Sequence, residues 1–164
     1  MKLSSLLTLT AGVSGMMIPQ AQGGVEQKDI VRIESTLPVS EVGCHGNPFS
    51  VSDALAAKEK LANWSEKGNR VEPHNMHGAF YITAVWYACN CKFWHHDAVP
   101  KEELDEAERL IEAKCGRGVS GWVWSEDWAK TWTVQQWLVI LGKAPQDVCP
   151  PECVYGDLEK LDVT

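Results

Sequence analysis

Basic clusters are missing from this sequence, and so is any long apolar run after Ile18. The 164 residues include 15 Lys and Arg but 22 Asp and Glu, which gives a formal net charge of −7. A chain with this charge is repelled by nucleic-acid phosphates and by anionic lipid surfaces. No apolar segment beyond Ile18 is long enough to span a membrane. We therefore expect neither a nucleic-acid partner nor a membrane-spanning segment.

Signatures of common hydrolases are also absent. The chain has no Gly-x-Ser-x-Gly nucleophile elbow, and no serine and histidine stand at a spacing that marks a catalytic pair. Glu126 and Asp127, near several tryptophans, suggest a glycosidase carboxylate pair, but adjacent side chains usually point apart. We expect no catalytic residue and no cofactor, and a small hydrolase remains the alternative.

The N-terminus has the features of a secretory signal peptide. Lys2 supplies a positive charge, residues 3–18 are apolar or small, and Ala21-Gln22-Gly23 offers a cleavage site. We expect the mature chain to be extracellular. The predicted organisation is a signal peptide over 1–23, a flexible arm or pro-segment over 24–43, one domain over 44–155 and a polar tail over 156–164.

Six cysteines behind a signal peptide predict three disulfides. Closing a long loop with each of them contributes about 3–4 kcal/mol in the chain-entropy model, a large share of the stability of a small domain. Zinc is a competing interpretation for Cys149-x-x-x-Cys153, but an oxidising compartment disfavours a thiolate site. The predicted disulfide cysteines are Cys44, Cys89, Cys91, Cys115, Cys149 and Cys153.

Two amphipathic helices are predicted from spacing and end signals. The first follows a capping Ser50 or Ser52 and ends at Gly68. The second starts at Pro100 and ends at Gly116. Their expected buried stripes are Ala54, Ala57, Leu61 and Trp64 in the first helix, and Leu104, Ala107, Ile111 and Cys115 in the second.

β-Branched and aromatic residues predict strands at 80–91, 122–124 and 131–141. Apolar residues on both faces of the first run favour a strand that is buried on both sides. This strand and the second helix look like a β-α-β unit closed by a disulfide. The predicted fold is α+β: an antiparallel sheet of three to four strands with two helices on one face, stapled by disulfides.

The pairing of the cysteines can be argued in part. Cys89 and Cys91 lie two residues apart on a strand, so both side chains point to one face, which we expect to be the helix-covered face. Each needs a partner from that face: Cys115, at the end of the second helix, is one natural candidate, and Cys44, just before the first helix, is another. Cys149 and Cys153 then bond to what remains or to each other.

Five histidines form two groups and one single residue. His74 and His77 precede the long predicted strand, and His95-His96-Asp97 follows it. Extended over Ala79–Cys91, that strand is about 40 Å long, which places the two groups at opposite ends. We therefore expect polar loops and no metal site.

Eight tryptophans are many for this length. They favour either a binding surface, where Trp is a common anchor, or a small core that uses large side chains. Trp94, in a predicted loop, is expected to be the most exposed. Asn63-Trp64-Ser65 is a glycosylation sequon, with Asn63 as its acceptor. The candidate binding surface comprises Trp94, His95, His96, Trp124 and Trp128.

The order of these features resembles a known class of proteins. An Ala-Leu-rich helix over 53–64, an aromatic strand with Cys89 and Cys91, and a helix over 104–115 followed by Cys-Gly and Gly-Trp are the matching parts. They are similar to small secreted cysteine-rich proteins of filamentous fungi, in particular the effector and killer-toxin-like group. The resemblance implies an α+β sandwich that acts outside the cell, and it transfers no functional residue.

These features together predict a secreted, non-enzymatic, monomeric protein of effector or toxin-like type. It is expected to bind a host protein, a receptor or a cell-wall glycan. A carbohydrate-binding module that uses exposed Trp is a further alternative to the small secreted hydrolase.

Overall fold

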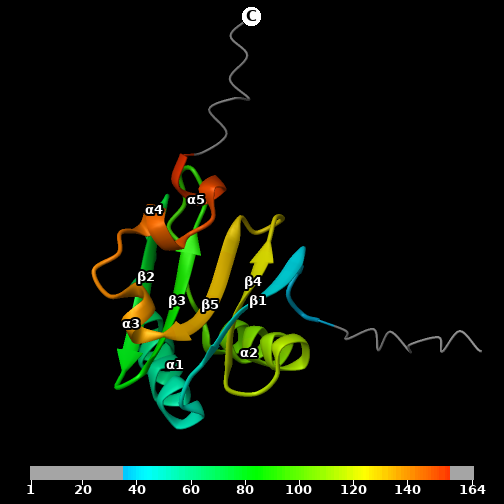
Figure 1. Ribbon diagram of the computed structural model, residues 1–164. Helices are drawn as coiled ribbons and strands as arrows, with labels where there is room; N and C mark the ends of the chain where they lie inside the picture. The colour runs from blue at the N-terminus through cyan, green and yellow to red at the C-terminus, as the bar shows by residue number, and fades with distance from the viewer. Residues whose placement is uncertain (1–34, 156–164) are drawn as a thin grey trace, which may run out of the picture. The chain divides into compact units, whose positions relative to one another are not determined.

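A computed structural model describes residues 35–155 of the chain. It confirms an α+β fold built on one antiparallel sheet, but the sheet has five strands rather than three or four. Their spatial order is β1-β4-β5-β3-β2, so β1 and β2 form the two edges (Figure 1). The strands are β1 (Glu41–Pro48), β2 (Asn75–Tyr81), β3 (Ala84–Asn90), β4 (Val119–Ser125) and β5 (Lys130–Gln136).

Two long helices cover one face of the sheet, as predicted. α1 (Val51–Glu66) packs on β2 and β3, and α2 (Lys101–Cys115) packs on β4 and β1. Both lie behind the sheet in Figure 1. The Ser50 side chain caps α1 by accepting a hydrogen bond from the backbone N–H of Asp53. We call the side of the sheet that α1 and α2 cover the helix face.

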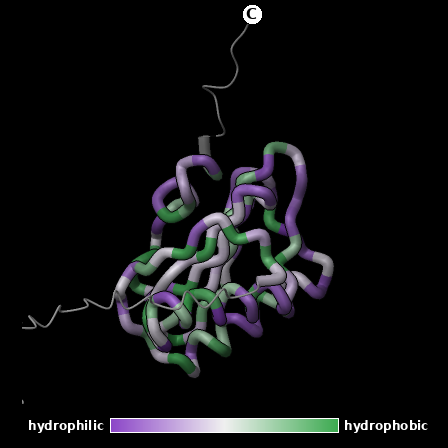
Figure 2. The backbone as a smooth tube through the Cα atoms, turned by 90° about the vertical axis from the view of Figure 1, so that its right-hand side faces the viewer, coloured by the Kyte–Doolittle hydropathy of each residue, from purple (hydrophilic) through white to green (hydrophobic). Residues whose placement is uncertain are grey.

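The helix face holds the main core. Trp86 of β3 and Trp132 of β5 are fully buried there, together with Leu61 of α1 and Leu104 of α2. Large side chains from both layers therefore interdigitate, which is how a small domain buries much apolar area with few residues. Figure 2 shows that strongly hydrophilic stretches lie mostly in the outer loops.

A buried ion pair fixes the start of α2 to the sheet. Lys130 is 1% exposed, and its Nζ lies 2.6 Å from Glu103 Oε2. Lys130 Nζ also donates to the Ala98 carbonyl, and Trp132 Nε1 donates to the same Glu103 oxygen at 3.0 Å. Burial raises the pKa of Glu103, and the Lys130 ammonium offsets part of that rise.

The opposite face carries a covering that the sequence did not predict. The chain after β5 forms α3 (Trp137–Ile140), α4 (Pro145–Val148) and α5 (Pro151–Tyr155), which cross in front of the sheet in Figure 1. We call residues 137–155 the strap. A second, smaller core under it includes Val85, Tyr87 and Ile140.

Three disulfides are present, as predicted, but their expected partners were wrong. Cys89 and Cys91 share a face, and that face is the one under the strap. They bond to Cys149 and Cys153, while Cys44 bonds to Cys115. The expectation failed because Ala84, Trp86 and Ala88 supply the helix-facing side of β3, which turns the cysteines to the other side.

The long strand predicted over 80–91 is a hairpin. β2 and β3 pair in antiparallel register with a turn at Ile82–Thr83, where Ile82 has φ +45°. No Gly, Asn or Pro marks this turn in the sequence. The Asp53 carboxylate of α1 accepts hydrogen bonds from the backbone N–H and hydroxyl of Thr83, so a tertiary contact supports the turn.

Two further boundaries differ from the predictions. β5 ends at Gln136 instead of continuing to Leu141, because its partner β3 begins opposite, at Ala84. The ordered fold also begins before Cys44, since Leu37 is buried in the main core and β1 starts at Glu41. The predicted signal peptide, most of the arm and the polar tail lie outside the described residues.

Candidate functional site

The predicted surface residues lie in three different settings. Trp94, His95 and His96 lie in the loop after β3, and Trp94 is 83% exposed, as its loop position predicts. Trp128, in the turn between β4 and β5, packs partly against the helix-face core. Trp124 lies on the strap-covered side of β4. The structure therefore does not bring all five together into one surface.

The two histidine groups are closer in the fold than the sequence suggested. Because β2 and β3 form a hairpin, His74 reaches the end of β3, where its ring meets Phe93 edge-on at 4.8 Å. The expectation that His74 and His95 lie at opposite ends of one strand was wrong. His77 instead stacks on Trp64 with ring centroids 3.6 Å apart. Within residues 35–155 no group of three or more His, Cys, Asp or Glu side chains is arranged to hold a metal ion.

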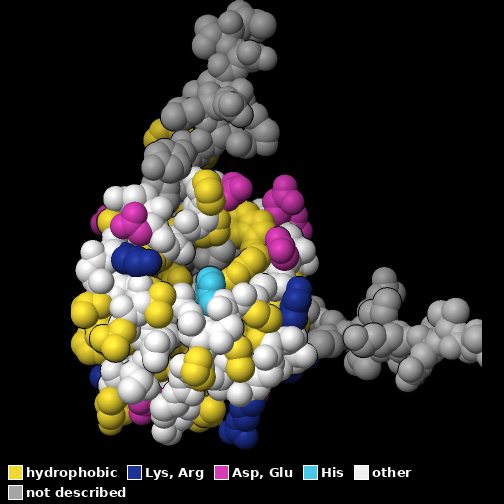
Figure 3. Space-filling view, in the orientation of Figure 1, with side chains coloured by type: hydrophobic (Ala, Val, Ile, Leu, Met, Phe, Trp, Pro, Cys, Tyr) yellow, Lys and Arg dark blue, Asp and Glu magenta, His cyan; other side chains and the backbone are white. Residues whose placement is uncertain are grey.

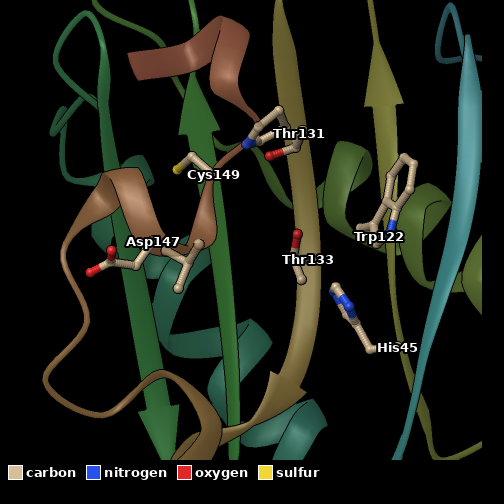
Figure 4. Close-up of a pocket in the computed structure, with 8 residues that line it drawn as sticks. His45, Trp122, Thr131, Thr133, Asp147 and Cys149 are labelled. Atoms are coloured by element: carbon tan, nitrogen blue, oxygen red, sulfur yellow. The ribbon is translucent and has the colours of Figure 1, made fainter. Parts of the chain in front are cut away.

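A groove of about 320 Å³ opens between the strap and the β1–β4 half of the sheet. Figure 4 shows Trp122 on one side, the Thr131 and Thr133 side chains on β5 between the walls, and the strap on the other side. We call it the Trp122 groove. Its lining consists of His45, Trp122, Thr131, Thr133 and the strap residues Asp147, Val148, Cys149 and Pro150.

A glycine sets the position of the Trp122 ring. Gly43 of β1 pairs with Trp122 of β4, and a Cβ atom added to Gly43 would lie 2.3 Å from the indole carbons. The indole therefore lies against the bare backbone of the edge strand. This packing holds one aromatic face at the wall of the groove, a position that any larger residue at 43 would disturb.

Two threonines of β5 form the floor of the groove. The Thr131 side chain is almost fully buried, and its Oγ1 has no hydrogen-bond partner in the described part of the chain. Thr133 instead forms a side-chain hydrogen bond with Tyr87. Burial raises the pKa of Tyr87, and this hydrogen bond offsets part of the rise. A buried hydroxyl without a partner is unfavourable, and although Thr131 Oγ1 is itself covered, a small local shift would let a ligand with hydrogen-bonding groups reach it.

The rims of the groove carry two titratable residues. Partial burial lowers the pKa of His45, which keeps the imidazole neutral near pH 7, where it can donate one hydrogen bond and accept another. Asp147 caps the start of α4 by accepting a hydrogen bond from the Ala144 backbone N–H at 3.0 Å. In Figure 4 its carboxylate points away from His45, so the two do not form an acid–base pair.

A second pocket, of about 440 Å³, lies where β3 and β4 end. Its aromatic members are Trp124 and Phe93, and its acidic members are Glu126 and Glu152. We call it the Trp124 pocket. Lys92 also lines it, but its ammonium is bound to Asp97 at 2.8 Å. Cys91 and Ala129 complete the lining.

Sequence reasoning missed Trp122, His45, Thr131 and Thr133 as site residues. The alternation Trp122-x-Trp124 and Thr131-x-Thr133 does indicate that each pair shares one face of its strand. Nothing in the sequence says which face stays open, because that depends on where the strap is attached.

No family model, no curated protein and no solved structure matches this chain. Among the described residues, no helix combines the length and the apolar character needed to cross a membrane. The three disulfides are of the kind found in proteins of oxidising compartments.

Proposed function

We propose that this is a secreted, non-enzymatic protein of effector or toxin-like type that binds a carbohydrate in the Trp122 groove. The signal-like N-terminus and the three disulfides support secretion. Among the partners expected from the sequence, a host protein, a receptor or a glycan, the shape and lining of the groove favour the glycan.

The lining suits the two kinds of surface that a sugar presents. The flat face of a pyranose ring carries C–H bonds that pack against the electron-rich face of an indole, here Trp122. The ring edge carries hydroxyls that need donors and acceptors. Thr131, Thr133 and the neutral imidazole of His45 supply both around the same cavity.

The observation that carries the proposal is the unpartnered hydroxyl of Thr131. Thr131 is 2% exposed, yet its Oγ1 meets no protein donor or acceptor in the described residues, and it lines the groove. Leaving such a group unpaired costs about 1–3 kcal/mol. The oxygen itself is covered in this structure, so a sugar hydroxyl would satisfy it only after a small local shift, whereas an apolar ligand would not satisfy it at all.

A glycan-array assay on the secreted protein tests this function. We expect specific binding by the wild type, a loss of at least about tenfold in Trp122→Ala, and partial retention in Trp122→Phe, which keeps an aromatic face. Trp94→Ala is the matched control, because Trp94 is exposed in another loop. A wild type that binds no glycan, or an unchanged Trp122→Ala, would refute the proposal.

A small hydrolase remains the second candidate, because Glu126 and Glu152 line one pocket together. Both side chains are exposed, whereas the general acid of a glycosidase is typically enclosed by apolar groups. Incubating the protein with any oligosaccharide that it binds separates the two functions. Newly formed reducing ends that disappear in Glu126→Gln would establish hydrolysis, and an intact ligand would exclude it.

A further inference from the structure

We propose that the Trp124 pocket is a second subsite of the same binding face and takes a positively charged sugar unit, a hexosamine with a free ammonium group. This inference rests on the proposed carbohydrate function and specifies its ligand. The ligand is then an oligosaccharide that spans both cavities, with a neutral face on Trp122 and a cationic group between Glu126 and Glu152.

The two cavities are neighbours along β4. Trp122 and Trp124 lie two residues apart on one face of the strand, a separation of about 6.8 Å. Thr131 pairs directly with Trp124 in the sheet and also lines the Trp122 groove. Thr131 therefore lies beside the boundary between the cavities, with its unpartnered hydroxyl covered in this structure.

The chemistry of the Trp124 pocket favours a cation. Two aromatic rings, Trp124 and Phe93, attract a cation through their faces, and Glu126 and Glu152 add two carboxylates from different elements. Within residues 35–155 neither carboxylate takes part in an ion pair, and Lys92 is held by Asp97. The cation in its lining, Lys92, is already paired with Asp97, so the two carboxylates leave the pocket acidic.

The charge around the Trp124 pocket also favours a cationic ligand. Figure 3 shows acidic side chains at the upper rim of this face, next to hydrophobic ones, with a histidine below them. The formal net charge of the whole chain is −7, which attracts cationic ligands and repels anionic ones. A sugar is favoured over a lysine-rich peptide because the adjoining Trp122 groove offers an aromatic wall and hydroxyl groups.

The test compares two soluble hexamers of equal length, one of glucosamine with free amines and one of N-acetylglucosamine, by calorimetry at near-neutral pH and low salt. We expect the amine form to bind wild-type protein more tightly. Glu126→Gln combined with Glu152→Gln should weaken the amine form at least about tenfold and leave the acetylated form unchanged, because charge-assisted hydrogen bonds are lost.

The matched control replaces two exposed glutamates elsewhere, Glu66→Gln and Glu72→Gln, which changes the net charge by the same amount. An effect equal to that of the pocket variant would assign the attraction to overall charge and overturn the subsite. Failure of the wild type to prefer the amine hexamer would also overturn it. Binding of another glycan on the array would still leave the proposed function intact.

A lysine hexapeptide is the third probe. If it binds as tightly as the amine hexamer and its affinity is unchanged in Trp122→Ala, the pocket binds a cationic peptide and the sugar assignment is wrong. If Trp122→Ala weakens the amine hexamer but not the peptide, the two cavities act together on a sugar, as proposed.

Discussion

The two faces of the sheet are covered in different ways. Helices of 16 and 15 residues cover the helix face, while the described helices of the strap have only four or five residues each. The helix face buries Trp86 and Trp132 completely, whereas Trp122 and Trp124 are only partly buried on the other side. One face is built mainly for burial, and the other leaves aromatic rings accessible.

The buried polar groups on the two faces of the sheet also differ in their surroundings. On the helix side, the buried ammonium of Lys58 lies 2.6 Å from carboxylate oxygens of both Asp105 and Glu108, and Lys130 pairs with Glu103. Trp86 Nε1 also has no hydrogen-bond partner among residues 35–155, but Trp86 is enclosed in the core. Thr131 differs because the residue itself lines a groove. Covalent attachment of the strap explains this difference, because disulfides hold it without requiring complete burial.

The largest expected effect comes from cutting the strap free. Replacing Cys89, Cys149, Cys91 and Cys153 by Ser should lower the free energy of unfolding by about 4 kcal/mol or more and abolish binding in the Trp122 groove, which loses a wall. Thermal unfolding and glycan binding are measured together.

The control for strap release is the Cys44–Cys115 disulfide. Its sequence separation of 71 is close to the 60 of Cys89–Cys149, so the chain-entropy model gives a similar loss, about 4 kcal/mol, for either bond alone. Cys44→Ser with Cys115→Ser should nevertheless retain binding at temperatures where the protein is folded. Equal loss of binding in both variants would contradict the division between the faces.

Lys130→Met should have the next largest effect, because it leaves the Glu103 carboxylate buried without its cation. We expect a loss of about 3–5 kcal/mol at neutral pH. The pKa of Glu103 is already raised in the folded state, so the folded protein holds this proton more tightly than the unfolded chain. Stability from this group therefore decreases as pH rises above the ordinary Glu value.

The free energy of unfolding should fall further with rising pH in Lys130→Met than in the wild type, since the ammonium that lowers the pKa of Glu103 is gone. Urea unfolding at several pH values between about 4 and 8 measures it. A variant that loses stability equally at every pH would show that Glu103 is not the group responsible.

A smaller effect is expected at Gly43. Gly43→Ala places a Cβ within the Trp122 ring, so the indole must move, at a cost of about 1–3 kcal/mol. Because the displaced ring no longer forms the wall, glycan binding should decrease more than stability does. Gly46→Ala in the same strand is a control for glycine replacement, since a Cβ there meets no atom within 4 Å, although its positive φ adds strain.

The smallest change in stability, and the sharpest test of the binding face, comes from the two floor threonines. Thr131→Val removes an unpaired hydroxyl and should raise the free energy of unfolding by up to about 1 kcal/mol while weakening glycan binding. Thr133→Val removes the hydrogen-bond partner of Tyr87 and should lower the free energy of unfolding by about 1 kcal/mol. If both variants lose stability equally, Thr131 has a partner after all.

Local signals predicted much of the fold correctly. Ser50 and Gly68 marked the ends of α1, and the apolar spacing of Leu104, Ala107 and Ile111 identified the buried side of α2. β-Branched and aromatic residues located β3, β4 and β5. These features depend on contacts within one element, so the order of residues is enough to recognise them.

The hairpin and the candidate site could not be predicted in this way. The turn at Ile82–Thr83 carries none of the usual turn residues and relies on Asp53. Thr131 and His45 are separated by 86 positions and meet only because β1, β4 and β5 are neighbours in the sheet.

Local residue patterns were enough to predict the α+β class, the two long helices, the number of disulfides and the shared face of Cys89 and Cys91. Which face those cysteines occupy, which partners they take and where a groove stays open depend on how the elements pack together. Alternation along a strand separates its residues into two sets, but it does not tell which set will be covered by helices. The packing of helices against Trp86 fills one face, and the strap is then bonded to the other.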